Sequence, residues 1–481
     1  MERVAQSQYY SDDNFKEKCG VFGVYGIDQA AEIVLQGLKA LQHRGQDSAG
    51  IAGYKGSEYS RVAELGLVTQ VFSNDNLRGI IANKAVGQVR YTTSQGLSKD
   101  HAQPVEIDIG NDEKLFLSHN GNIPDTRPLE KLLDSRNISY TYLNDTEMVG
   151  QVFGLFIRQG AKLVDAYWEM ASRVPGVYSL AMLTPREMAA ARCEYGVKPL
   201  SFGKIDNSYV VSSETIGLDA VNAEFIRDVT PGEFISFNEN GLDAYQLFDP
   251  KYKLCIFEAI YFASPKSYLY GRVVEDYRIE FGRQLAREHK IFADVVFSLP
   301  DSGNFATKGY SEISGIPMEA GLIKNRAIDR TFITAGMDEK MAKAEAKYIP
   351  QKQLIDGRDT ITVDDSQVHG TTDRVTVPLL RKNGASKVIV LKASPCYRFS
   401  NHYGTNTSYQ PDLASYGRTE EELRDWIGAE YLGFLSLEGM KKTLGKYRDM
   451  FDFSVFDGNY PVPIGERAKE IVYPQKELAS V

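Results

Sequence analysis

The arrangement of apolar runs changes near Pro250, and that change limits the folds that this chain can adopt. Upstream, short strand-like runs follow one another; four of them, in residues 177–214, predict a meander of antiparallel strands. Downstream, the buried strand-like runs ADVVFSLP, TITVDD and SKVIVLKASP alternate with helical patterns such as residues 375–383. We therefore predict an α+β unit followed by an α/β unit with a doubly wound parallel sheet.

The segment DTITVDDSQVHGTT, residues 359–372, gives the second unit its clearest ligand signal. Its β-branched run ends in Asp364 and Asp365, and a loop of small residues then leads into the next helical pattern. Unpaired backbone N–H groups in such a loop cradle phosphate, and adjacent carboxylates suit ribose hydroxyls or Mg²⁺. Because ligands of open α/β sheets bind at the carboxyl ends of strands, the segment predicts a site for a phosphorylated sugar.

In the first unit, a cysteine that opens a strand is followed by four polar clusters, each of which alone is typical of a surface loop. A cysteine that opens a strand is likewise more often a small apolar side chain than a nucleophile. After Cys19-Gly20 the clusters are, in chain order, HRGQD at 43–47, Arg90-Tyr91, HNGN at 119–122 and NDTE at 144–147. Taken together, this order resembles the class II glutamine amidotransferases, in which an N-terminal cysteine is the nucleophile.

This resemblance implies that Cys19 attacks the side-chain amide of glutamine and that residues 1–18 are a leader whose removal exposes the α-amine of Cys19. A free α-amine titrates near about pH 8, which suits a general base far better than a peptide nitrogen does. The resemblance also implies that Asn120 and Gly121 form the oxyanion hole. The residues implied in glutamine binding are Arg44, Arg90 and Asp145.

The second unit resembles the type I phosphoribosyltransferases, whose loop for phosphoribosyl pyrophosphate (PRPP) is similar to DDSQVHGTT. In that family the acids meet the ribose and the metal, the loop wraps the 5′-phosphate, and basic residues neutralise pyrophosphate. The residues implied in PRPP binding are Asp364, Asp365, Ser366, Gly370, Thr371, Thr372, Lys324, Arg326 and Lys347. A Mg²⁺ ion in each subunit is implied, with Ser302, Asp364 and Asp365 as the residues that hold it.

A class II glutaminase ahead of a phosphoribosyltransferase is the arrangement of the glutamine PRPP amidotransferase family, and the resemblance runs from about Cys19 to Tyr460. It implies an α+β N-terminal-nucleophile glutaminase domain (an αββα sandwich) followed by an α/β type I phosphoribosyltransferase domain with a mostly parallel sheet. The predicted boundaries are a leader at 1–18, the glutaminase domain at 19–250, the phosphoribosyltransferase domain at 251–445 and a C-terminal tail at 446–481.

The activity implied by the resemblance is the first step of de novo purine synthesis. Glutamine is hydrolysed and its ammonia displaces pyrophosphate from PRPP, which gives 5-phosphoribosylamine and glutamate. The resemblance also implies a homo-oligomer, with glutamine and PRPP as substrates and purine nucleotides as feedback inhibitors.

Several residues depart from the family's pattern and leave an alternative open. In the PRPP loop, Gln367 and His369 replace an apolar residue and an arginine, and Asp373 stands where a small hydroxyl residue is usual. Asp329 and Glu345 add negative charge to the segment expected near pyrophosphate, at a cost on the order of a kcal/mol for each opposing charge. The alternative is a paralogous glutamine amidotransferase whose acceptor is another phosphosugar or a specialised metabolite. A non-catalytic PRPP sensor is disfavoured by the intact glutaminase residues.

The cysteines favour neither disulfides nor a metal cluster. Four are present, Cys19, Cys193, Cys255 and Cys396, and none belongs to a CxxC pair. Some members of the family carry an iron–sulfur cluster, but here only Cys255 matches a ligand position and Asn401 stands at another. We therefore predict no iron–sulfur cluster. In the first unit, Gln88 replaces a histidine that the family usually has before Val-Arg-Tyr.

Composition excludes two classes of partner. The formal net charge is -9, which argues against nucleic acid as a partner. No apolar run approaches the roughly 20 residues of a membrane span, and the polar start of the chain lacks the apolar core of a secretory signal. The sequence therefore predicts a cytoplasmic protein that binds neither nucleic acid nor membrane.

Overall fold

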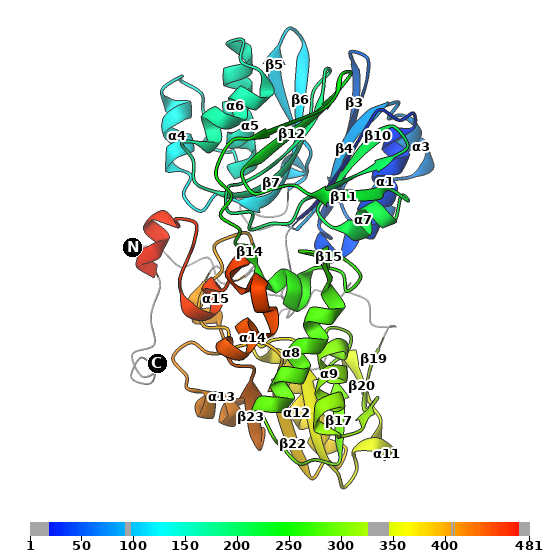
Figure 1. Ribbon diagram of the computed structural model, residues 1–481, viewed down its shortest axis with the longest axis vertical. Helices are drawn as coiled ribbons and strands as arrows, with labels where there is room; N and C mark the ends of the chain where they lie inside the picture. The colour runs from blue at the N-terminus through cyan, green and yellow to red at the C-terminus, as the bar shows by residue number, and fades with distance from the viewer. Residues whose placement is uncertain (1–18, 92–97, 326–345, 406, 408, 471–481) are drawn as a thin grey trace.

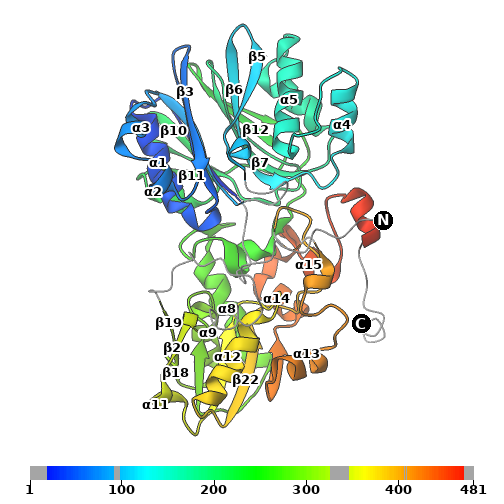
Figure 2. The ribbon, with the colours of Figure 1, turned by 180° about the vertical axis from the view of Figure 1, so that it is seen from behind.

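The structure is a computed structural model that describes residues 19–91, 98–325, 346–405, 407 and 409–470. The described residues form two units that are stacked along the longest axis, with the N-terminal unit uppermost in Figure 1. Figure 2 shows the same two units from behind. Within the described ranges, no helix has the length and apolar character needed to cross a membrane.

The N-terminal unit is built from two antiparallel sheets packed face to face. Buried side chains such as Val21, Phe116, Phe202 and Phe237 fill the space between the sheets. One sheet has the order β11-β9-β10-β1-β4-β2-β3, and the other has the order β13-β12-β8-β7-β6-β5. The strands are β1 (Cys19–Tyr25), β2 (Ser48–Lys55), β3 (Glu58–Leu65), β4 (Lys84–Arg90), β5 (Val105–Gly110), β6 (Glu113–Asn122), β7 (Val177–Leu183), β8 (Met188–Arg192), β9 (Ser201–Ile205), β10 (Ser208–Ser212), β11 (Glu224–Asp228), β12 (Glu233–Asn238) and β13 (Gly241–Gln246).

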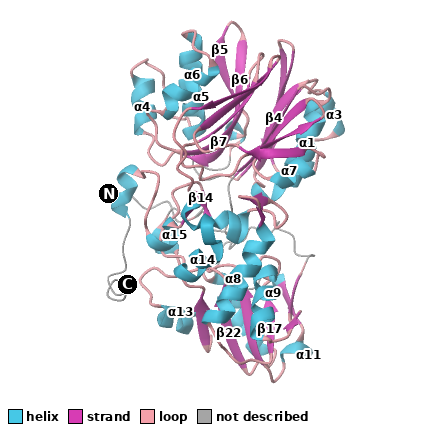
Figure 3. Cartoon of the chain, in the orientation of Figure 1, coloured by secondary structure: helices cyan, strands magenta, loops and turns pink. Residues whose placement is uncertain are grey.

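Helices cover the outer face of each sheet, which completes the predicted αββα sandwich (Figure 3). The apolar side of α1, with Val34 and Leu38, packs on the first sheet, and that of α5, with Val152 and Phe153, packs on the second. The helices of this unit are α1 (Ala30–Ala40), α2 (Val68–Val71), α3 (Asn74–Arg78), α4 (Arg127–Asp134), α5 (Asp145–Arg158), α6 (Leu163–Ala171) and α7 (Thr215–Asp219).

The predicted four-stranded meander in residues 177–214 is wrong in its pairing, although all four strands form. Strands β7 and β8 pair in one sheet, whereas β9 and β10 pair in the other. The chain crosses between the layers in the segment after Arg192, whose buried guanidinium donates hydrogen bonds to the carbonyls of Gly196, Lys198 and Val229. This side chain satisfies the carbonyls of Gly196 and Lys198 in the crossing, where the backbone leaves one sheet for the other.

The C-terminal unit contains the predicted parallel sheet, with the strand order β18-β17-β21-β22-β23. Both faces are covered, and the strands therefore read as continuous apolar runs. Tyr277 and Tyr310 pack on one face, while Leu380 and Leu423 pack on the other. The elements are β17 (Val295–Ser298), β18 (Met318–Glu319), β21 (Asp359–Asp364), β22 (Lys387–Lys392), β23 (Tyr431–Phe434), α8 (Val274–Glu288), α9 (Asn304–Ser314), α12 (Thr371–Lys382), α13 (Glu420–Ile427) and α14 (Leu437–Leu444).

Short elements join the two units. Strand β14 (Leu254–Cys255) pairs in parallel with β24 (Phe451–Asp452), so a segment near the end of the chain lies against the connection between the units. A π-helical turn, Glu258–Phe262, follows β14. In this region Cys255 is a buried core residue opposite Asp452, and the Asn401 side chain accepts a hydrogen bond from the Tyr403 N–H at 2.8 Å. The absence of an iron–sulfur cluster stays a prediction.

The buried Asp452 gives the junction a pH-dependent stability. Burial raises the pKa of this carboxyl to about 7, against hydrogen bonds from Ser454 that lower it. Between about pH 4 and that value, the folded protein keeps a proton that the unfolded chain releases, so stability falls as pH rises through this window. We expect Asp452→Asn to raise Tm relative to the parent protein, by a difference that grows from pH 5 to pH 8 in calorimetry.

The exposed Asp449 provides the matched control for this experiment. Its Asn variant should show a Tm difference from the parent that does not change over the same pH range. A constant Tm difference for the Asp452 variant would contradict the assignment of the proton to that carboxyl.

Candidate functional site

Cys19 is the first residue of β1 and lies in the interior of the N-terminal unit. Its side chain is 5% exposed, and the residue pairs with Arg90 of the neighbouring strand β4. The Arg90 guanidinium is also buried and donates a hydrogen bond to the His101 carbonyl at 2.8 Å. The sheet thus brings together the predicted nucleophile and one of the predicted glutamine-binding residues.

Strand β6 presents Asn120 and Gly121, the predicted oxyanion-hole pair. Asn120 is fully buried, and neither its amide nitrogen nor its amide oxygen has a hydrogen-bond partner among the described residues. A buried amide without a partner costs roughly 1–3 kcal/mol, so an unsatisfied donor here points to a bound ligand. At Gly121 a side chain is excluded, because a Cβ atom would lie 1.9 Å from the Val177 carbonyl oxygen.

Two glutamines that the sequence analysis did not assign to the site hold this strand in place. Gln88 donates to the His119 carbonyl and accepts from the His119 N–H, both at 2.9 Å. Gln103 accepts from the same N–H at 2.9 Å and donates to the Thr146 hydroxyl at 3.1 Å. The amide that replaces the family's usual histidine at position 88 therefore keeps two hydrogen bonds, whereas nothing in the sequence singles out Gln103.

The other two predicted glutamine-binding residues differ in their surroundings. Asp145 begins α5, directly after the N-cap residue Asn144, and its carboxylate accepts hydrogen bonds from the N–H groups of Ile123 and Thr146 at 3.1 and 2.9 Å. Arg44 is entirely buried and donates to the Cys19 carbonyl at 3.1 Å and to two glutamates. Arg44 thus lies behind the nucleophile and supports its strand.

We expect Asn120→Ala to lower the kcat of glutamine hydrolysis by about 10²–10³, because one oxyanion donor is lost. The Ser118 hydroxyl, two positions earlier on the same strand, is also buried without a hydrogen-bond partner, so Ser118→Ala is a matched control with little expected effect. Glutamate release measured for the two variants checks the prediction, and equal rates would contradict the role of Asn120.

The carboxylate pair of the C-terminal unit lies at the carboxyl end of β21. Asp364 ends the strand and accepts a hydrogen bond from the ammonium of Lys392 at 3.0 Å. The Ser302 hydroxyl donates to Asp364 at 3.5 Å, and the Ser366 hydroxyl donates to Asp365 at 2.5 Å. Burial and the neighbouring charge of Asp364 raise the pKa of Asp365 to about 7. The two buried carboxylates therefore repel each other despite Lys392, and a cation bound beside them would relieve that repulsion.

The predicted phosphate loop leads directly into a helix. Gly370 has φ +72° and is the N-cap residue of α12, which begins at Thr371 rather than at the expected Val375. A Cβ atom at Gly370 would lie 2.5 Å from the Trp426 ring, so this position has room only for glycine. The helix N-terminus and the hydroxyls of Thr371 and Thr372 therefore lie at the end of the loop, where they favour an anion.

The unusual residues of the loop bind one another. The Gln367 amide donates to Asp373 at 2.7 Å, and Lys392 donates to the same carboxylate at 2.8 Å. All three side chains are buried, so the extra acid is neutralised within the fold. The Nδ1–H group of His369 donates a hydrogen bond to the Asp412 carbonyl at 2.9 Å.

Two of the basic residues predicted to neutralise pyrophosphate lie in or next to a two-stranded ribbon, β19 (Leu322–Lys324) and β20 (Tyr348–Pro350). Lys324 donates to the Asp301 carboxylate at 2.7 Å, and Lys347 directly precedes β20. Burial and the charges of the acids at 364, 373 and 365 raise the pKa of Tyr348, which places this end of the ribbon near the carboxylate pair. Arg326, Asp329 and Glu345 lie outside the described residues.

The carboxylates of Asp364 and Asp365 suit Mg²⁺, which needs few protein ligands, better than a cation whose ligands all come from the protein. In the described part of the chain, no three His, Cys, Asp or Glu side chains gather as metal ligands. Mg²⁺ is commonly held by one or two carboxylates, with waters and substrate phosphates as its other ligands. Ser302 and Asp365 line a common small pocket.

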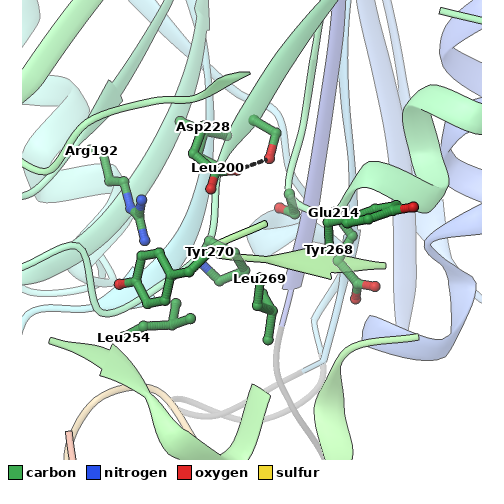
Figure 4. A pocket seen from close by; sticks show the side chains of 11 residues that line it. Arg192, Leu200, Glu214, Asp228, Leu254, Tyr268, Leu269 and Tyr270 are labelled. Carbon is green, nitrogen blue, oxygen red and sulfur yellow. Dashed lines mark hydrogen bonds between the residues drawn. The ribbon is translucent and has the colours of Figure 1, made fainter. Parts of the chain in front are cut away.

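A second small pocket lies where the two units meet (Figure 4). Arg192, Glu214 and Asp228 line it from the N-terminal unit, and Tyr268 and Tyr270 line it from the C-terminal unit. The guanidinium of Arg192 is already used by three backbone carbonyls. The two units therefore meet at this pocket, and Glu214 is one of the residues that line it.

Comparison with known proteins agrees with this geometry. The family described as "Glutamine amidotransferase domain" matches residues 90–220. The amidophosphoribosyltransferase of Bacillus subtilis is 37% identical over 93% of this chain and 95% of its own length, and that of Mycobacterium leprae is 37% identical over 94% and 83%. The solved B. subtilis glutamine PRPP amidotransferase, complexed with ADP and GMP, superposes with a TM-score of 0.87 at 36% identity and covers 95% of this chain and 99% of that chain.

Proposed function

Since this chain belongs to the amidophosphoribosyltransferase family, we propose that it hydrolyses glutamine and transfers the ammonia to PRPP. The products are 5-phosphoribosylamine, pyrophosphate and glutamate, and the reaction is the first step of de novo purine synthesis. The observation that carries the proposal is the presence, in one chain, of a buried Cys19 with the unsatisfied Asn120 amide and of a carboxylate pair at the end of a parallel strand.

In the glutaminase half, Cys19 Sγ attacks the glutamine amide carbon, and the α-amine of the mature Cys19 takes the thiol proton. The Asn120 amide and the Gly121 N–H stabilise the oxyanion of the tetrahedral intermediate. Arg90 binds the α-carboxylate of glutamine, and Asp145 binds its α-ammonium group. The α-ammonium group returns this proton to the amide nitrogen as the intermediate collapses and ammonia leaves, and water then hydrolyses the thioester to glutamate and the free thiol. This chemistry requires that residues 1–18 are removed.

In the phosphoribosyl half, backbone N–H groups and hydroxyls from Ser366 to Thr372 bind the 5′-phosphate, and Asp364 and Asp365 bind the ribose hydroxyls. Ammonia attacks the anomeric carbon as pyrophosphate leaves. Lys324, Arg326 and Lys347 stabilise the charge on the departing pyrophosphate. Asp364, Asp365 and Ser302 would hold Mg²⁺, which when bound supplies further positive charge to the pyrophosphate.

Regulation and assembly form part of the proposal. The solved relative from B. subtilis is complexed with ADP and GMP, which supports purine nucleotides as regulators of this chain as well. A second solved relative, described as the allosteric regulatory enzyme of purine biosynthesis, superposes with a TM-score of 0.88 at 35% identity. We propose a homo-oligomer that responds to purine nucleotides.

The decisive experiment combines intact mass and N-terminal sequencing of the purified protein with a product assay. With glutamine, PRPP and Mg²⁺, we expect Cys19 as the first residue and equal amounts of glutamate, pyrophosphate and 5-phosphoribosylamine. Glutamate formed without pyrophosphate, at saturating PRPP, would reject PRPP as the acceptor. Pyrophosphate release with ammonia but not with glutamine would reject the glutaminase assignment.

A further inference from the structure

The Arg44 guanidinium joins the nucleophile to carboxylates from both units. Its Nε atom donates to the Cys19 carbonyl oxygen at 3.1 Å. One terminal nitrogen donates to Glu214 at 2.5 Å and to Glu258 at 3.1 Å, and the other donates to Glu258 at 2.9 Å. All three charged side chains are fully buried. Each of the three guanidinium nitrogens therefore donates a hydrogen bond that is shielded from solvent.

Glu214, which precedes α7 in the N-terminal unit, also binds the segment that follows the π-helical turn. One of its oxygens accepts from the Ser264 N–H at 2.8 Å and from the Ser267 hydroxyl at 2.7 Å. The other oxygen, which Arg44 binds, also pairs with Nε2 of His43 at 2.8 Å. Although burial opposes ionisation, the charges of His43 and Arg44 hold the pKa of Glu214 below its usual range. Glu214 is therefore a charged contact between the two units.

Glu258 begins the π-helical turn of the C-terminal unit, and Arg278 of α8 holds the same turn from another side. The Arg278 guanidinium donates to the carbonyls of Ala259 and Ala263 at 3.0 and 2.8 Å. Arg278 and Asp365 line the same pocket. Covalent and hydrogen bonds therefore connect Cys19, through Arg44 and the turn that begins at Glu258, to Arg278, which lines the same pocket as Asp365. Short π-helical segments often occur at functional sites.

We propose that Glu214 and Glu258 are positioning residues for Cys19, which they orient through Arg44. This inference rests on the proposed function and adds two residues to it. The hydrogen bond to the Cys19 carbonyl fixes the peptide unit next to the nucleophile, and hence the directions of both its α-amine and its Sγ atom. Small displacements of a reacting group are costly, because rate depends steeply on near-attack geometry. The nucleophile of one unit is thus oriented by a carboxylate of the other.

Neutral isosteres test this role. We expect Glu258→Gln and Glu214→Gln to lower the kcat of glutamine-dependent synthesis about tenfold or more, with less than a threefold change in KM for glutamine. Ammonia-dependent synthesis should stay within about twofold of the parent protein, since the PRPP loop is unchanged, and this activity also reports correct folding. The matched control is Glu233→Gln, because Glu233 accepts two hydrogen bonds from Arg227 at 2.7 Å, away from Cys19.

A labelling experiment separates this inference from the proposed function. A diazoketone analogue of glutamine alkylates a correctly placed nucleophile without any acceptor, and mass spectrometry of the Cys19 peptide gives the rate. Labelling that is about tenfold slower in the Glu258 and Glu214 variants supports the inference, whatever the acceptor is. Labelling at the parent rate overturns it, even where the parent protein makes 5-phosphoribosylamine. An equal loss of glutamine- and ammonia-dependent synthesis would also overturn it, since the effect would then be on the whole fold.

Discussion

Cys19→Ala is expected to lose glutamine-dependent synthesis by a factor of about 10⁴ or more, because no other group can form the thioester. Ammonia-dependent synthesis should persist near the parent rate, since the phosphoribosyl half needs only ammonia and PRPP. Cys19 and the acid pair belong to different units of the fold, so loss of one chemistry need not affect the other. Pyrophosphate release, measured with glutamine and then with ammonium chloride as the nitrogen source, gives both rates.

The control for this variant is Cys193→Ala. Cys193 is 1% exposed and lies in the same unit as Cys19, so its replacement tests the effect of deleting a buried thiol alone. Both activities of the control variant should be close to those of the parent protein. If Cys19→Ala kept its activity with glutamine, the nucleophile would be another residue. If a folded variant lost both activities, the two sites could not be separate.

The sequence predicts the C-terminal sheet well because each of its buried strands appears in the sequence as one continuous apolar run. Strands covered on both faces must be apolar throughout, and the acids at 364 and 365 mark the end of one of them. The αββα sandwich was predicted through resemblance, whereas the pairing within residues 177–214 was predicted wrongly from local patterns. A strand's own residues do not say which of two sheets it joins; the carbonyls bound by Arg192 favour the crossing, and those contacts exist only in the fold.

Site residues that act through contacts formed only in the fold were also not predicted. Gln103 acts through a hydrogen bond to the backbone of β6, and a lone glutamine in a sequence has no pattern that indicates such a contact. Glu214 and Glu258 lie 170 and 214 positions from Arg44. Their carboxylates are indistinguishable in the sequence from those of surface glutamates. Predicted ligands that belong to a motif, such as Asp364, are visible because the motif has a strand, a loop and a helix around it.

The double variant Asp364→Asn with Asp365→Asn is expected to abolish synthesis with either nitrogen source, by a factor of about 10³ or more. Asp364 ends β21 and Asp365 follows it directly; burial and the charge of Asp364 raise the pKa of Asp365 to about 7, so a bound cation would favour the charged form of both acids. Amides cannot offer this negative charge to ribose hydroxyls or to Mg²⁺. Hydrolysis of glutamine without PRPP should remain, since Cys19 and Asn120 are untouched. PRPP binding by calorimetry, in the presence of Mg²⁺, is expected to be lost together with synthesis.

A control at the other end of the same strand makes this result specific. Asp359 begins β21 and forms an exposed ion pair with Lys387 at 2.7 Å, so Asp359→Asn changes one carboxylate of the strand far from the loop. Such exposed pairs contribute about 0–1 kcal/mol, and synthesis by this control should match the parent. Retained PRPP binding in the double variant would mean that the loop backbone and the lysines suffice for the phosphates. The acids would then not be ligands of PRPP, and Asp364 would serve instead to neutralise the buried Lys392, which Asp373 also binds at 2.8 Å.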